Sequence, residues 1–266
     1  MASIKDWKPV DLVQTLVFGS FKTGKTAGAA TFPRPNFIDL DQGIGTLASE
    51  WWKKKFGEKE ILYESFKETK KNHLGVVTEP HAFDDACRYF DKYMKPDLRD
   101  TFDTWIIDSG SMLTEFANNK AVYLLGGIMP GVASNTMANA KKFGLVAPKL
   151  QDFGAERSMA EQFIQMCLDS GKHFVLICHE QVIANDEGVI QSIGPMFTGK
   201  SRQLIPLKFS EVYRIKIQRQ GTEMKRSLMT QTDGISQVGT RLGVPDGTEW
   251  TWDAINKSLN NLKEKK

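Results

Sequence analysis

Residues Gly19 to Thr26 read GSFKTGKT and match the phosphate-binding loop pattern G-x-x-x-x-G-K-[ST]. The octet follows the apolar run Leu16 to Phe18, which is typical of a β-strand. In a strand, loop and helix unit of this kind, the backbone N–H groups of the loop surround an anion at the start of the helix, where the helix dipole favours negative charge. We therefore predict that the octet binds the phosphates of a nucleotide. The predicted phosphate-binding residues are Gly19, Ser20, Phe21, Lys22, Thr23, Gly24, Lys25 and Thr26.

Two residues of the octet have side chains suited to particular roles. Lys25 is expected to contact the β- and γ-phosphates, and the Thr26 hydroxyl is expected to bind Mg²⁺. A second protein ligand for Mg²⁺ is expected at the end of another strand. Asp108, which follows the apolar run Trp105 to Ile107, is the candidate. An aspartate at this point also occurs as the cap of a following helix, which is the alternative explanation. A glutamate directly after this aspartate could supply the carboxylate that activates water. The chain has Ser109 at that position, so this carboxylate must lie elsewhere.

Two further apolar runs end in polar residues that could act on a bound nucleotide, and the first supplies candidates for that carboxylate. Asp41 lies just after the run that begins at Asn36, where open α/β sheets bind ligands, so we expect it to act as the general base. Asp39 is its nearest rival, and both acids could instead cap a loop. His179 and Glu180 end the run that begins at His173, and we expect them to sense the γ-phosphate and contribute to catalysis.

The chain between these sites alternates strand and helix patterns. Short apolar runs typical of buried strands predict strands at Thr15 to Phe18, Asn36 to Leu40, Thr104 to Ile107 and His173 to Cys178. Apolar residues at helical spacing predict a helix from Phe83 to Met94, and a capping-box pattern predicts that another helix begins at Ser158. This alternation predicts an α/β fold with a mainly parallel central sheet flanked by helices.

The pattern changes towards the C-terminus. Tyr213, Ile215 and Ile217 alternate with polar residues, and Gly221 is expected to turn this strand into an antiparallel hairpin with the segment Arg226 to Thr230. The stretch from Trp250 to Lys266 predicts a closing helix. We therefore divide the chain into a core, residues 1–215, and a C-terminal hairpin and helix, residues 216–266, packed on that core.

Composition narrows the class of protein. The chain has 266 residues, 41% of them hydrophobic, and a net charge of +3, which is too small to indicate nucleic-acid binding by itself. No run approaches the length of a transmembrane helix, and the first residues lack the apolar stretch of a secretion signal, so we expect a cytoplasmic protein with no membrane partner. The three cysteines are spaced as ordinary core residues rather than as a zinc site or a disulfide framework.

The segments GSFKTGKT, FIDLDQG, WIIDSGSML and FVLICHEQ, in this order, resemble the core of the RecA-type ATPases. The shortened form is similar to the phage-encoded RecA-like ATPases that anneal single-stranded DNA. The resemblance implies a RecA-like P-loop core, ATP and Mg²⁺ as cofactors, ATP hydrolysis, and a role in phage DNA annealing or recombination. It also implies single-stranded DNA as a partner, assembly into a homo-oligomeric ring or filament, and contact with a single-strand-binding protein. Asp41 stands where such proteins usually have glutamate.

In such proteins the loops after the magnesium strand and the sensor strand bind DNA, which here are the irregular segment Gly126 to Pro148 and the segment Val182 to Arg202. Each combines cations with an aromatic residue that could stack on a base. The predicted DNA-binding residues are Lys141, Lys142, Phe143, Phe197, Lys200 and Arg202. Because such active sites are completed by a neighbouring subunit, a trans-acting finger is also expected, and it is Lys200, Arg202 or Arg241.

Two other functions remain open. A small-molecule kinase would need a lid with several arginines over the phosphates, and the segment Gly126 to Pro148 contains none. An interaction module that binds nucleotide with little hydrolysis is favoured by the short acid Asp41.

Overall fold

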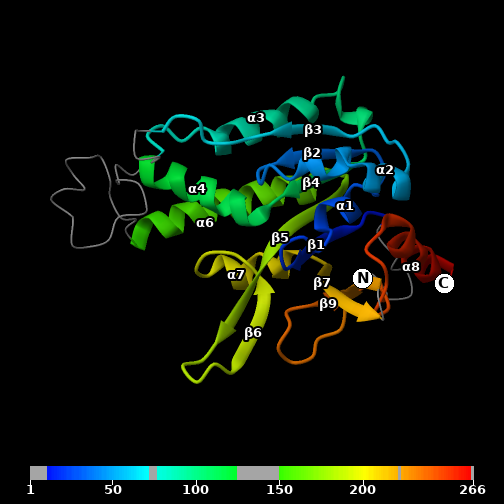
Figure 1. Ribbon diagram of the computed structural model, residues 1–266. Helices are drawn as coiled ribbons and strands as arrows, with labels where there is room; N and C mark the ends of the chain where they lie inside the picture. The colour runs from blue at the N-terminus through cyan, green and yellow to red at the C-terminus, as the bar shows by residue number, and fades with distance from the viewer. Residues whose placement is uncertain (1–10, 72–76, 125–149, 221–222, 265–266) are drawn as a thin grey trace, which may run out of the picture.

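The computed structural model describes residues 11–71, 77–124, 150–220 and 223–264, and its centre is one large sheet (Figure 1). The strands that correspond to the four predicted core strands are β1 (Gln14–Gly19), β2 (Pro35–Asp39), β4 (Thr104–Asp108) and β5 (His173–Ala184). The remaining strands are β3 (Leu62–Ser65), β6 (Ile190–Pro195), β7 (Glu211–Gln220), β8 (Glu223–Met229) and β9 (Gly239–Thr240). Each of the four strands predicted for the core is present within a residue or two, apart from the longer β5.

The strand order is β3-β2-β4-β5-β1-β7-β8, with β6 paired to β5 and β9 paired to β7. Every pair from β3 to β7 along this path is parallel, and β8 is antiparallel to β7. The predicted mainly parallel sheet and C-terminal hairpin are therefore confirmed. Strand β5 lies between β1 and β4, so it separates the strand that leads into the phosphate loop from the strand that ends at Asp108.

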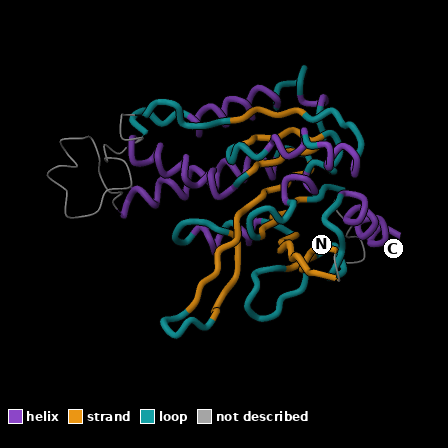
Figure 2. Tube along the Cα trace, viewed as in Figure 1, coloured by secondary structure: helices purple, strands orange, loops and turns teal. Residues whose placement is uncertain are grey.

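Helices cover both faces of the sheet (Figure 2). One face carries α3 (Ala82–Tyr93), α4 (Gly110–Leu124) and α6 (Leu150–Asp169). The other carries α1 (Lys25–Ala29), α2 (Glu50–Phe56) and α8 (Trp252–Glu264). Successive residues of β1 alternate between these layers, since Leu16 and Phe18 pack in the first and Val17 in the second. Short helical turns η2 (Ile44–Ala48), η3 (Arg99–Thr101), α7 (Ser201–Leu204) and η5 (Pro206–Lys208) complete the described elements.

The segment Val182 to Arg202, predicted to be a loop that binds DNA, is instead mostly a β-hairpin, so the predicted loop conformation is wrong and the DNA binding stays a prediction. Strand β5 continues past the sheet to Ala184 and pairs with β6 in antiparallel fashion. A tight turn joins the two strands, because the Asn185 side chain accepts hydrogen bonds from the backbone N–H groups of Glu187 and Val189. The hairpin projects from the body of the molecule (Figure 1).

Two further boundaries differ from the sequence-based predictions. Helix α6 begins at Leu150 rather than Ser158, which is exposed within the helix and accepts a hydrogen bond from Gln162. A Ser-x-x-Glu pattern therefore does not by itself mark a helix start. The predicted division at residue 215 falls inside β7, a strand that pairs with β1 in the middle of the sheet. None of the helices among the described residues is long and apolar enough to cross a membrane.

The helix after the phosphate loop is short, and two distant tryptophans hold it. The Trp250 indole donates a hydrogen bond of 2.8 Å to the Lys25 carbonyl, and the Trp52 indole donates one of 3.2 Å to the Ala27 carbonyl. Both rings are buried. Gly28 lets the Trp250 ring approach this closely, because a Cβ at that position would lie 1.9 Å from Trp250 Cδ1. The C-terminal part of the chain thus fixes the base of the phosphate loop.

Gly28→Ala tests this packing. We expect it to lower the free energy of unfolding by at least about 2 kcal/mol, because the added methyl group must displace both the ring and the backbone of Trp250. Gly154→Ala is the matched control, since nothing lies within 4 Å of its added Cβ in the exposed part of α6. This control should gain stability, by up to about 1 kcal/mol. Urea unfolding of both variants measures the difference, and an unchanged Gly28→Ala would contradict the packing.

Candidate nucleotide-binding site

The phosphate loop joins β1 to α1 with the backbone shape of an anion nest. Gly24, at the start of α1, has φ 90°, which glycine adopts without strain, and Lys22 has φ 60°. Alternation between left-handed and ordinary backbone turns successive N–H groups to one side. The Thr23 hydroxyl donates to the Ser20 carbonyl at 2.9 Å and closes the loop. The predicted strand, loop and helix unit is therefore present in detail.

Lys25 is buried, and its side chain bends back over the loop. Its Nζ donates to the carbonyls of Gly19 at 2.9 Å and Ser20 at 2.8 Å. Burial lowers the pKa of Lys25, and the negative charges of Asp108 and Asp41 oppose that change. The ammonium group therefore already lies at the mouth of the loop, where a phosphate oxygen could replace the carbonyls as its acceptor.

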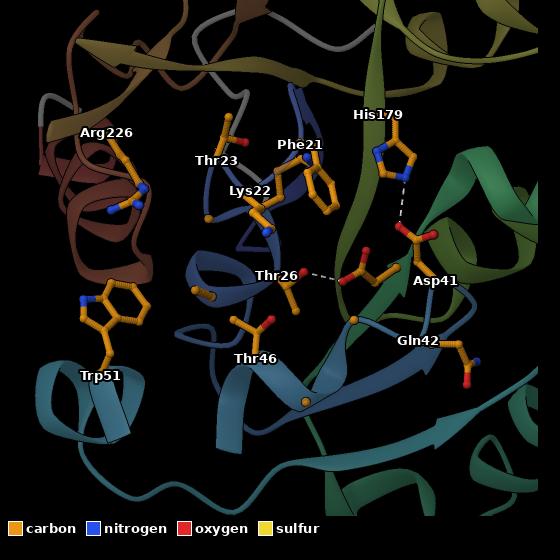
Figure 3. Close-up of a pocket in the computed structure, with 16 residues that line it drawn as sticks. Phe21, Lys22, Thr23, Thr26, Asp41, Gln42, Thr46, Trp51, His179 and Arg226 are labelled. Atoms are coloured by element: carbon orange, nitrogen blue, oxygen red, sulfur yellow. Dashed lines mark hydrogen bonds and ion pairs between the residues drawn. The ribbon is translucent and has the colours of Figure 1, made fainter. Parts of the chain in front are cut away.

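Thr26 and Asp108 meet at the ends of different elements. The Thr26 hydroxyl donates to Asp108 Oδ2 at 2.5 Å, shown as a dashed line in Figure 3. Asp108 is only 3% exposed, and burial raises its pKa to about 6, helped by the charges of Asp41 and Asp39 and opposed by the bond from Thr26. The predicted juxtaposition of these two side chains is present.

These two oxygen groups fit a magnesium ion. Mg²⁺ prefers oxygen ligands and is usually held by one or two protein groups together with phosphates and water. Burial destabilises the charged form of an aspartate, and a nearby cation would stabilise that form. Thr26 and Asp108 would therefore hold the ion, which would supply positive charge to neutralise the phosphates.

Asp41 lines the same cavity as the phosphate loop. Its Oδ2 is 2.8 Å from His179 Nε2, and the Asp41 side chain is about one third exposed. Asp39, the rival acid, is 1% exposed and accepts hydrogen bonds from the Gly43 N–H and the Ser65 hydroxyl. Asp39 therefore supports the loop after β2, whereas Asp41 keeps an oxygen available to the cavity.

Glu180 has a different environment from the one that a general base needs. Its Oε2 accepts from Arg214 Nε at 2.7 Å, and its Oε1 accepts from Ser20 and from the second Arg214 nitrogen at 3.2 Å each. The carboxylate joins the phosphate loop to β7. This arrangement favours Asp41 over Glu180 as the group that contacts the attacking water, and gives Glu180 a positioning role.

Lys25, Thr26, Asp108, Asp41 and His179 line one cavity of about 770 Å³, whereas Asp39 and Glu180 do not line it. Figure 3 shows the phosphate loop in the middle, with Asp41 and His179 on one side and Trp51 and Arg226 on the other. Gln42, Gly43, Gly45 and Thr46 also line the cavity. Sequence reasoning did not place Trp51 or Arg226 in this site. The position of Trp51 close to the basic run Lys53 to Lys55 was a weak signal for this residue. No local sequence pattern marks Arg226.

Of the residues predicted to bind DNA, those that the structure describes do not line this cavity. Lys141, Lys142 and Phe143 fall outside the described residues. Phe197 is 5% exposed and packs in the core, so it does not fit the predicted stacking on a base. Lys200 is exposed and Arg202 is partly buried, and both lie at the base of the hairpin. Neither they nor Arg241 lines the cavity, so any contact with the γ-phosphate remains a prediction about a neighbouring subunit.

The fold and the site together define a P-loop nucleotide-binding protein with a mainly parallel sheet. Comparison with known families gives the particular group: residues 13–242 match the family described as an AAA domain, and the chain belongs to that family of P-loop ATPases. No curated protein matches the sequence. Among solved structures, a KaiC-like protein from the hyperthermophilic archaeon Pyrococcus horikoshii matches with 15% identity and a TM-score of 0.42, covering 82% of this chain and 77% of that one. The family assignment does not depend on this structure.

Asp108→Asn should stabilise the protein without metal or nucleotide. Because the pKa of Asp108 is about 6 in the folded chain and 3.8 is its ordinary value, the folded state binds more protons between these pH values, and stability falls as pH rises through them. Asparagine removes the buried charge but can still accept from Thr26. We expect a gain of roughly 2–3 kcal/mol at pH 7.5, shrinking to nothing near pH 4.

Urea unfolding in EDTA across this pH range measures the effect. The control is Asp186→Asn at the exposed tip of the hairpin, which should change stability little at any pH. A stability difference for Asp108→Asn that does not depend on pH would show that Asp108 is not destabilised by burial.

Proposed function

We propose that this chain is a Mg²⁺-dependent ATPase whose turnover is coupled to binding of single-stranded DNA. The observation that carries the hydrolytic part is the arrangement of Lys25, Thr26 and Asp108 around one end of a cavity that also contains Asp41. This set separates groups that would hold phosphate and metal from a carboxylate that is free to contact water. The resemblance seen in the sequence suggests that the activity serves DNA annealing or recombination in a phage.

The chemistry follows from the positions of these side chains. The backbone nest and Lys25 hold the β- and γ-phosphates, and Asp41 accepts a hydrogen bond from a water that faces the γ-phosphorus. As the water oxygen forms its bond to phosphorus, its proton passes to Asp41 and the bond to the β-phosphate oxygen breaks, leaving ADP and phosphate. His179 contacts Asp41 at 2.8 Å and orients the carboxylate. Mg²⁺ at Thr26 and Asp108 would neutralise charge that develops on the phosphates.

DNA coupling is supported by position rather than by an observed contact. His179 lies on β5, and the same strand continues into the projecting hairpin that leads through β6 to Lys200 and Arg202. Residues 181–199 of this hairpin contain no lysine or arginine, and Asp186 and Glu187 are at its tip. Phosphate contacts on this side would therefore come from Lys200 and Arg202 at its base. Lys141 and Lys142 are proposed to contribute further contacts but lie outside the described residues.

Asp41→Asn separates hydrolysis from nucleotide binding. The amide keeps the size of the side chain but cannot accept the proton of the water, so we expect turnover to fall roughly 100-fold or more while ATP affinity changes little. Single-turnover hydrolysis and equilibrium ATP binding measure the two effects. Lys25→Ala is the comparison variant, because it should weaken ATP binding itself. Unchanged hydrolysis by Asp41→Asn would move the role to another group, and absent hydrolysis by the parent would favour an interaction module.

Single-stranded DNA should bind with a strong dependence on salt and should stimulate hydrolysis. Replacing both Lys141 and Lys142 with alanine should weaken binding and flatten the log–log salt slope by about 1.4, because roughly 0.7 counterion is released per phosphate contact on a single strand. Lys92→Ala with Lys95→Ala, at the end of α3, is the control of equal charge. If the parent fails to bind single-stranded DNA at low salt with ATP and Mg²⁺, the DNA part of the proposal is wrong and the ATPase part stands.

A further inference from the structure

The cavity extends well beyond the phosphate loop, and its far end is bounded by a tryptophan and an arginine. Trp51, on α2, is 47% exposed and lines the cavity, so part of its indole surface is accessible to a ligand there. The Arg226 guanidinium, on β8, lies 5.8 Å from the centre of the Trp51 ring. Figure 3 shows this pair across the phosphate loop from Asp41 and His179.

We propose that Trp51 and Arg226 form a base-stacking subsite that holds the purine of a nucleoside triphosphate between the indole and the guanidinium. This inference rests on the proposed function, because the phosphate end must first be fixed. If the γ-phosphate faces Asp41 and His179, the chain of phosphates runs along the loop and the ribose and base extend in the opposite direction. Trp51 and Arg226 are the cavity-lining side chains at that end with a planar π surface or a planar cation.

The spacing of the pair is close to what a stacked base requires. Carbon atoms in contact lie about 3.5–4.0 Å apart, so a base between two planar groups needs them about 7–8 Å apart. The present separation is 5.8 Å, so Arg226 must move outward by about 1–2 Å. Its side chain is exposed and long, which permits this movement without change in the sheet. Without nucleotide, the guanidinium occupies the face of Trp51 that a base would use.

Both members of the pair are tied to the phosphate loop. Trp51 precedes Trp52, whose indole bonds to the Ala27 carbonyl of α1, so α2 is fixed against the helix that follows the loop. The Arg226 side chain crosses directly over the loop, since a Cβ on Gly24 would lie 3.2 Å from its Cδ. A base held here would therefore be at a fixed distance from the phosphates bound by the same loop.

The subsite would recognise the ring surface of a base rather than its edge. Lys55 and Glu249 line the adjoining hollow, but they form an ion pair of 2.6 Å with each other. Stacking depends on ring area and occurs with any base, so purines should be favoured over pyrimidines, with ATP and GTP affected alike.

The test compares ATP with inorganic tripolyphosphate, which carries the phosphates but no base. Calorimetric titration of the full chain with each ligand, in Mg²⁺, is carried out for the parent, Trp51→Ala and Arg226→Ala. We expect Trp51→Ala to weaken ATP and GTP binding about 10- to 100-fold and to leave tripolyphosphate binding unchanged. Arg226→Ala should weaken ATP and GTP binding less than Trp51→Ala does, and Trp51→Phe should restore most of the ATP affinity.

Two control variants distinguish the possible failures. Tyr63→Ala removes another exposed aromatic side chain, on β3, and should affect neither ligand, whereas Lys25→Ala should weaken both. Parental ATP affinity in Trp51→Ala, or equal weakening of ATP and tripolyphosphate, would overturn the stacking subsite. Failure of the parent to bind either ligand would instead refute the proposed nucleotide-binding function.

Discussion

The alignment of parallel strand ends is the constraint on which the site depends. Asp39 of β2 stands opposite Asp108 of β4, and Gly19 of β1 stands opposite His179 of β5. Parallel pairing in this register brings all of these carboxyl ends to one edge of the sheet, where open α/β sheets bind ligands. A shift by one residue would turn every one of these side chains to the other face. Because β5 continues beyond this edge, it presents His179 above the loop.

The same edge buries several ionisable side chains close to one another. Asp108 and Asp39 are almost fully buried beside each other, and burial raises the pKa of each. Lys25 nearby carries the opposite charge, and its pKa is lowered by burial. Such groups reduce stability unless a ligand compensates them, and perturbed ionisable groups concentrate at functional sites for that reason. A triphosphate with its metal ion has the charges that would relieve both the cation and the acids.

Sequence reasoning succeeded where a short pattern determines the local structure. The loop octet, the strand before it and the acid at position 108 are each encoded within a few neighbouring residues, and the structure has them as predicted. It failed for the hairpin after β5, although the turn Asn185 to Gly188 between apolar residues was a usable signal. It could not join Trp51 to Arg226, because residues so far apart in the chain meet only through the order of strands in the sheet. Phe197 was predicted to stack on a base but is buried in the core. Whether an aromatic residue is buried depends on the tertiary fold rather than on its sequence neighbours.

The position of β1 has a consequence for biosynthesis. This strand is made first, yet its neighbours are β5 and β7, and the helix that follows it is closed by Trp250. A ribosome adds roughly 5–20 residues each second, so the apolar run Leu16 to Phe18 emerges at least about ten seconds before its last partners do. During that time the run has no sheet to join, and the loop has no fixed shape. The ability to hold a nucleotide is thus acquired only after Trp250 has been made, and a chain whose synthesis stops before that point does not sequester ATP.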